Sequence, residues 1–230
     1  MFGLWDALGA AACAACGAGE VWGGRGLPGR LCGDCLAEWP TAPTPLGRLP
    51  PGVDGGQALG SYAGPVGGLL RKVKYGGDPA LIPLLAGELA ALLEPEPVDR
   101  VTWMPTVPTR LLWRGFNLPE ELGRALGQAW GVPAGPLLRR EGGARRARVA
   151  HADRRALARP HVEVLRPPPA RVLLVDDVVT TGATASAAAD ALRLAGAREV
   201  RLVVAATALP PENSGRKGDV GSLSRSVGEA

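Results

Sequence analysis

The sequence predicts an α/β fold, in which a mostly parallel sheet is flanked by helices and preceded by a small N-terminal zinc-binding domain with four cysteine ligands. Short apolar runs alternate with helical patterns, and one such run ends in a carboxylate pair followed by a Thr- and Gly-rich loop. Two Cys-x-x-Cys pairs near the N-terminus indicate the metal-binding domain. Strands that alternate with helices favour parallel pairing with right-handed crossovers.

The apolar runs and their flanking residues define the predicted elements in order. Asp78 and Pro79 resemble an N-cap and a first helical residue, so a helix is predicted over residues 80–93. Asn117 is a candidate cap for a second helix, and a third begins near Thr184 and ends at Gly196. Strands are predicted over residues 98–104, 171–175 and 200–206, and the second helix over residues 118–129.

The composition bounds the domain organisation. Of 230 residues, 46% are hydrophobic, which is enough for a core, and the 33 Gly and 22 Pro imply many turns. We expect a four-cysteine zinc-knuckle domain over residues 1–40, a Pro/Gly linker over 41–57, a main domain over 58–209 and a disordered tail over 210–230. No apolar run reaches the ~18 residues of a membrane span, and residues 1–12 lack the basic start of a secretory signal. A cytoplasmic protein is therefore expected.

The cysteines form two closely spaced pairs, Cys13 with Cys16 and Cys32 with Cys35. Each spacing lets two thiolates reach one ion, and the loop between the pairs can close a tetrahedral site. With no secretion signal, disulfides are not favoured. A structural Zn²⁺ is the preferred interpretation, with an iron–sulfur cluster or a redox pair as alternatives.

Asp176 and Asp177 follow the apolar run Val172–Val175. Adjacent carboxylates at a strand end can accept hydrogen bonds from two vicinal hydroxyls, or help to hold Mg²⁺. The following loop offers hydroxyls and backbone N–H groups, and the next helix directs its positive end toward the same place. This loop consists of Thr180, Thr181, Gly182, Ala183 and Thr184. The pattern suits a ligand with both a sugar diol and a phosphate.

Residues 172–184 resemble the phosphoribosyl pyrophosphate (PRPP) signature of type I phosphoribosyltransferases. The resemblance implies the phosphoribosyltransferase type I fold. It also implies that Asp176 and Asp177, the expected catalytic residues, hold the ribose hydroxyls. The 5-phosphate would then lie in the loop of residues 180–184.

A second anion site is expected after the strand that ends at Met104 and Pro105. The segment that follows carries Arg110 and Arg114, and its loop would project from the same sheet edge as the carboxylate pair. Two guanidinium groups there could bind a pyrophosphate through bidentate hydrogen bonds. The alternative is a solvated basic turn.

The segment Arg114-Gly115-Phe116-Asn117 is similar to a motif of the ComF family, which is amidophosphoribosyltransferase-like and linked to natural competence. The cysteine pairs, the Leu-x-Lys-Tyr-Gly-type segment at residues 70–76 and the PRPP motif follow in the order of that family. The resemblance covers roughly residues 10–207. It implies a role in natural transformation and DNA uptake.

The net charge of +4 is unevenly distributed, because residues 139–159 alone carry eight arginines against Glu141 and Asp153. Three interpretations remain for this segment. It could close over PRPP and neutralise departing pyrophosphate, contact nucleic acid, or form a solvated loop. The segment has no aromatic residue, so it offers no stacking surface for bases.

Two hypotheses for function follow. In the first, the protein binds PRPP–Mg²⁺ and transfers the phosphoribosyl group to an acceptor with release of pyrophosphate. In the second, it is a non-catalytic competence factor that contacts single-stranded DNA or the uptake helicase, and the PRPP motif serves as sensor or scaffold. Neither the acceptor nor the oligomeric state follows from the sequence.

Overall fold

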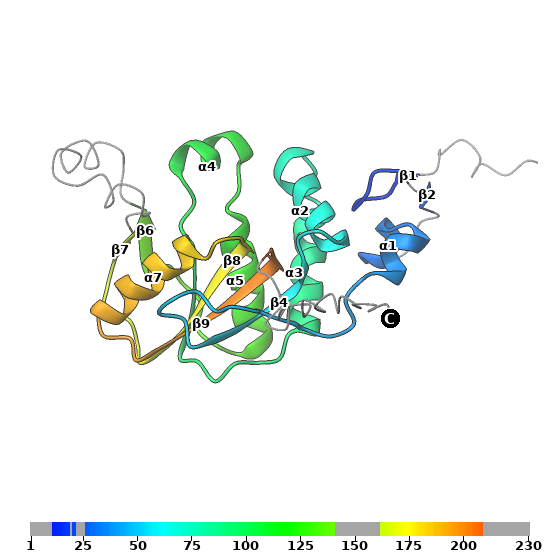
Figure 1. Ribbon diagram of the computed structural model, residues 1–230. Helices are drawn as coiled ribbons and strands as arrows, with labels where there is room; N and C mark the ends of the chain where they lie inside the picture. The colour runs from blue at the N-terminus through cyan, green and yellow to red at the C-terminus, as the bar shows by residue number, and fades with distance from the viewer. Residues whose placement is uncertain (1–10, 19, 22–25, 141–161, 209–230) are drawn as a thin grey trace, which may run out of the picture.

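The computed structural model describes residues 11–18, 20–21, 26–140 and 162–208, and its centre is a five-stranded sheet (Figure 1). The strand order is β3-β4-β9-β8-β5. β4, β9, β8 and β5 are parallel, and only β3 pairs antiparallel, at the edge. The bounds are β3 Thr44–Pro45, β4 Gly55–Ser61, β5 Arg100–Trp103, β8 Arg171–Val179 and β9 Glu199–Thr207. The predicted α/β fold with a mostly parallel sheet is confirmed.

Helices cover both faces of this sheet. The longer ones on one face are α2 Pro65–Tyr75, α3 Leu81–Leu92 and α5 Leu118–Trp130. The other face carries α7 Ala183–Leu194 and the antiparallel pair β6 Leu138–Arg140 and β7 Val162–Val164. Two buried apolar clusters result, one on each side of the sheet. Val172 and Leu174 pack on the α7 side, whereas Leu173 and Val175 pack on the other side, as alternation along a strand requires.

The limits of three strands differ from those expected, and β9 extends one residue beyond 200–206 at each end. β5 is shorter than residues 98–104, and β8 continues past Val175 to Val179. The extension exists because β9 supplies hydrogen-bonding partners as far as Thr207, which pairs with Val179. The carboxylate pair therefore lies inside β8 and not beyond its end.

The N-terminal region packs directly on α2 through the turn that carries the first cysteine pair. Its elements are β1 Ala11–Ala12, β2 Glu20–Val21, η1 Pro28–Arg30 and α1 Gly33–Ala37. Cys13, Cys32 and Cys35 are buried in the same cluster as Leu69 and Leu70 of α2. This region therefore shares a core with the main sheet, and Figure 1 shows it beside α2.

Residues 41–57, predicted as a linker, carry ordered packing as well. Thr44 and Pro45 pair with β4, and the side chains of Leu46 and Val53 are buried on the α7 side of the sheet. A short strand can pair at the edge of a sheet without an apolar run, so the Pro- and Gly-rich composition of residues 41–57 did not indicate this pairing. The predicted tail at 210–230 lies outside the described residues.

Among the helices of the described residues, none is both long and apolar enough to cross a membrane.

Candidate phosphosugar site and four-cysteine cluster

Asp176 and Asp177 lie in the C-terminal half of β8, next to the loop that follows β5. The backbone N–H of Met104, just after β5, donates to the carbonyl of Val175 at 2.8 Å. This bond continues the β5–β8 pairing and holds the loop of residues 104–107 beside the carboxylate pair. The expected meeting of the two segments at one sheet edge is thus present.

The two carboxylates have different surroundings. The backbone N–H of Asp177 donates to Oδ1 of Asp176 at 2.8 Å, whereas Oδ1 of Asp177 lies 2.8 Å from Nζ of Lys74. Burial and the neighbouring charge of Asp177 raise the pKa of Asp176 to about 8, although Lys74 and Arg140 act in the opposite direction. The pair therefore consists of one carboxylate bound to an ammonium group and one that readily keeps a proton.

The Thr- and Gly-rich loop follows β8 and leads into α7. Gly182 is the N-cap residue of α7 and has φ +75°. A Cβ there would lie 2.8 Å from Cγ of Pro50, so both the backbone conformation and the space favour glycine. The loop lines a polar cavity of about 40 Å³ together with Asp176. Backbone N–H groups at the start of a twelve-residue helix are suited to an anion.

A larger cavity, of about 190 Å³, lies between this loop and the segment after β5. Thr106 donates from Oγ1 to Oδ1 of Asn117 at 2.5 Å, which holds the segment in place. The side chain of Asn117 is thus used here and makes no capping hydrogen bond to α5. The lining residues are Met104, Pro105, Thr106, Val107, Arg114, Pro119, Arg140, Asp176, Asp177, Val178 and Thr184.

Arg114 ends α4 (Pro108–Arg114) and reaches this cavity. Its guanidinium carbon lies 5.1 Å from the ring centre of Tyr75 and 5.8 Å from that of Trp113. Its Nε is buried, with no hydrogen-bond partner among the described residues, so a donor remains for a ligand. Arg110 lies in the same helix, but its side chain is outside the described part of the chain.

The basic segment is described only at its start. Arg140 lines the larger cavity, and Arg139 forms an ion pair with Glu163 at 2.7 Å. Residues 141–161 lie outside the described residues, and with them most of the arginines that were expected to close over a ligand or to contact nucleic acid.

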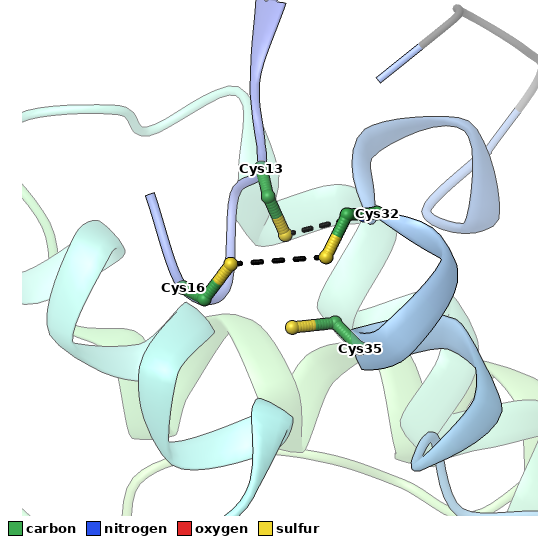
Figure 2. A group of neighbouring side chains, drawn as sticks. All are labelled: Cys13, Cys16, Cys32 and Cys35. Carbon is green, nitrogen blue, oxygen red and sulfur yellow. Dashed lines mark hydrogen bonds between the residues drawn. The ribbon is translucent and has the colours of Figure 1, made fainter. Parts of the chain in front are cut away.

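The four cysteines form one cluster in which the ligand atoms all lie within 4.8 Å of one another (Figure 2). The Sγ atoms of Cys16 and Cys32 are 3.7 Å apart, close to the ~3.8 Å between sulfurs of a tetrahedral site with Zn–S bonds of ~2.3 Å. All four are free of disulfides. The cluster could hold a metal such as zinc, and a complete thiolate shell would give that ion a structural role.

Hydrogen bonding in the cluster also favours a thiolate. The backbone N–H of Cys32 donates to Sγ of Cys13 at 3.3 Å. Burial raises the pKa of Cys13, but backbone donors from Cys16, Cys32 and Ala15 outweigh it and lower the pKa to about 6. Burial and the neighbouring thiols raise the pKa of Cys35. One thiol of the set is thus ready to ionise, as a metal ligand requires.

Sequence reasoning did not assign a role to Lys74 or single out Arg140, both of which approach the carboxylate pair. The segment at residues 70–76 served only as part of a family resemblance, and Arg140 only as one arginine of the basic segment. Nothing in the sequence connected these residues to the carboxylate pair, because both Lys74 and Arg140 lie far from Asp177 along the chain. The available local signal was a lysine in the last turn of a helix that ends at Gly76.

One comparison with known proteins bears on this region of the chain. Residues 164–227 match the family model described as "Phosphoribosyl transferase domain". No curated protein sequence matches the chain.

Three solved structures are partly similar. The allosteric regulatory enzyme of purine biosynthesis is 20% identical, with a TM-score of 0.36, covering 53% of this chain and 24% of that one. For the UMP synthase of Leishmania donovani the values are 25% identity, a TM-score of 0.33, and coverage of 58% and 23%. The purine phosphoribosyltransferase of Pyrococcus horikoshii Ot3 is 16% identical, with a TM-score of 0.30. The match covers 60% of this chain and 80% of that one. The chain thus spans about a quarter of the first two. The match to the family model supports a phosphoribosyltransferase-like region over residues 164–227.

Proposed function

We propose that this protein binds PRPP and acts as a phosphoribosyltransferase. The observation that carries the proposal is that two polar cavities adjoin and share Asp176, Val178 and Thr184. One cavity has the geometry of a helix N-terminus, and the other contains two arginines and two carboxylates. PRPP has the matching order of groups, since its ribose lies between a phosphate and a pyrophosphate.

In the proposed binding mode the loop of residues 180–184 holds the 5-phosphate, and Asp176 and Asp177 accept hydrogen bonds from the ribose hydroxyls. Arg114 and the loop of residues 104–107 receive the pyrophosphate, with Arg110 as a further candidate. Guanidinium groups suit this role because they bind phosphate oxygens through two parallel hydrogen bonds.

The proposed reaction is displacement at the anomeric carbon. The bond from that carbon to the pyrophosphate oxygen breaks with its electron pair leaving on pyrophosphate, and a nucleophilic acceptor forms the new bond. Arg114 and Arg140 stabilise the negative charge that develops on the departing group, and the loops fix the sugar for attack. Oxygen-rich groups are the donors that Mg²⁺ prefers, and bound Mg²⁺ would supply further neutralisation of the pyrophosphate.

We further propose that the protein belongs to the ComF family and acts in the cytoplasm during natural competence. Support comes from the combination of the four-cysteine cluster, the Arg114–Asn117 segment and the carboxylate pair in one chain.

A second candidate function is contact with single-stranded DNA, and a surface outside residues 139–159 favours it. Tyr75 and Trp113 are 65% and 71% exposed, and the guanidinium of Arg114 lies near both rings. Figure 1 shows α4 and the end of α2 projecting beyond the sheet on the same side. Exposed aromatic rings beside a cation can stack bases and contact phosphates.

Calorimetric titration of the zinc-loaded protein with PRPP and Mg²⁺ tests the first function. We expect binding by the wild type and none by the variant Asp176→Asn/Asp177→Asn. Absence of binding by a folded wild type would refute it. A parallel titration with single-stranded DNA tests the second function, for which Trp113→Ala should weaken binding of DNA more than binding of PRPP.

A further inference from the structure

Lys74 connects helix α2 to the carboxylate pair of β8 through an ion pair. It lies in the last turn of α2, and its Nζ is 2.8 Å from Oδ1 of Asp177. Both side chains are mostly buried, with 12% and 19% of their surface exposed. An ion pair this far removed from water is screened much less than a surface pair, so it affects the charge of the adjoining cavity.

The position of Lys74 is fixed by close packing of α2. A Cβ at Gly67 would lie 1.8 Å from the carbonyl oxygen of Tyr62, and one at Gly68 would lie 2.2 Å from that of Ala15. Backbone therefore meets backbone on two sides of the helix. Because an α-helix is stiff over two turns, these contacts also fix the last turn and direct Lys74 toward β8.

The charges around the larger cavity show what Lys74 contributes. Arg114 and Arg140 line it together with Asp176 and Asp177. Once Asp176 has lost its proton, which requires a pH above its pKa of about 8, these four groups balance formally. Lys74 tips the balance to positive through its contact with Asp177. Without that ammonium, two adjacent carboxylates would present oxygen donors to a divalent cation, which is the arrangement that Mg²⁺ and Mn²⁺ favour.

We propose that Lys74 is a positioning residue that sets the ligand selectivity of this site: by holding Asp177, it keeps the cavity selective for a phosphorylated anion and prevents the carboxylate pair from binding a bare divalent cation. This inference rests on the proposed function, because it concerns the same cavity. It adds a residue and a selectivity that the PRPP motif does not contain.

The α2 helix provides a matched control for this proposal. Lys72 shares the last turn of α2 and the favourable interaction of a cation with the helix C-terminus. Its side chain is exposed, whereas that of Lys74 is paired with Asp177. If the effect comes only from a positive charge at the end of α2, substitution of either lysine should produce it. A loss of ligand selectivity should follow only from substitution of Lys74.

The test compares Lys74→Met, Lys74→Arg and Lys72→Met with the wild-type full chain. Titration calorimetry measures the affinity for inorganic pyrophosphate and for PRPP in the presence of Mg²⁺. Electron paramagnetic resonance measures binding of Mn²⁺ alone, and thermal unfolding checks that each variant folds. We expect Lys74→Met to bind both anions about tenfold more weakly and Mn²⁺ alone about tenfold more tightly, because one unit charge is removed at short range. Lys74→Arg and Lys72→Met should remain within about threefold of wild type on the same electrostatic grounds.

Several outcomes overturn the proposal. Unchanged pyrophosphate affinity in Lys74→Met would do so, and so would loss of pyrophosphate without gain of Mn²⁺, which a purely structural role predicts. If Lys74→Met does not fold, Lys74→Gln takes its place with the same expected changes, because it also removes the ammonium charge beside Asp177; unchanged pyrophosphate affinity in Lys74→Gln would refute the inference. A wild type that binds pyrophosphate but not PRPP refutes the proposed function alone, and one that binds neither refutes both.

Discussion

The pKa of Asp176 leads to a pH dependence of PRPP binding that can be calculated. Burial and the charge of Asp177 raise this pKa from 3.8 to about 8. If the ribose hydroxyls require the ionised carboxylate, only about one site in ten is competent at pH 7 and about one in a hundred at pH 6. The apparent Kd for PRPP should therefore fall about tenfold for each pH unit from 6 to 8 and level off above that.

Calorimetry at constant Mg²⁺ between pH 6 and pH 9 measures this dependence. PRPP itself carries a phosphate that titrates near pH 6, so Asp176→Asn serves as the control. It should bind PRPP about as weakly as the wild type does at about pH 6, and its pH profile should show only the contribution of the ligand. The sign is informative, because a carboxyl pKa that is higher in the folded protein contributes stability at low pH that is lost as the pH rises toward about 8. Affinity should thus rise where this contribution to stability falls. Equal pH profiles for wild type and Asp176→Asn would refute the reasoning.

Three further perturbations follow from the packing. Gly68→Ala would place a Cβ 2.2 Å from the carbonyl oxygen of Ala15 and should lower the free energy of unfolding by about 1–3 kcal/mol in denaturant titrations. Gly87→Ala is the control, because it lies in α3 with nothing within 4 Å of its Cβ and should be neutral or slightly stabilising. Equal losses of unfolding free energy in the two variants would contradict the contact at Gly68. Gly182→Ala should weaken PRPP binding roughly tenfold in calorimetry, since strain at φ +75° adds to crowding against Pro50; unchanged affinity would show that the loop adapts. Chelation of the metal should lower the melting temperature in differential scanning fluorimetry, with recovery on adding Zn²⁺, because a metal that binds only the folded state stabilises it; no shift would argue against the metal site.

The parts of the fold that depend on local pattern were predictable. Val172–Val175 is apolar on both faces of its strand, as a buried parallel strand requires, and this strand lies inside the sheet between β9 and β5. The two cysteine pairs come together as their spacing implies. Gly182 has the positive φ that a tight approach to a helix N-terminus favours. In each case, the physical requirement acts within a few residues of the motif.

The remaining features depend on contacts between distant segments. β8 extends to Val179 because β9 continues beside it. Val178 and Val179 favour a strand by propensity, but Asp176 and Asp177 interrupt the apolar run before them. The difference between the two carboxylates likewise arises from Lys74, whose approach depends on how α2 packs. From sequence alone, Asp176 and Asp177 are equivalent acids that share one role. Packing makes one of them a partner of an ammonium group and leaves the other with a raised pKa.

Helix α2 connects the two chemical features of the protein. Its first half contacts the turn between Cys13 and Cys16 through Gly68, and its last turn carries Lys74 to Asp177. A metal bound by the cysteines would fix that turn, since the ion joins it to the second cysteine pair. The same close backbone contact that leaves no space for a side chain at Gly68 would then transmit this order to the helix. A metal held by the four-cysteine cluster would thus support the geometry of the carboxylate pair as well as the fold of the N-terminal region, although the cysteines contribute no residue to the cavity.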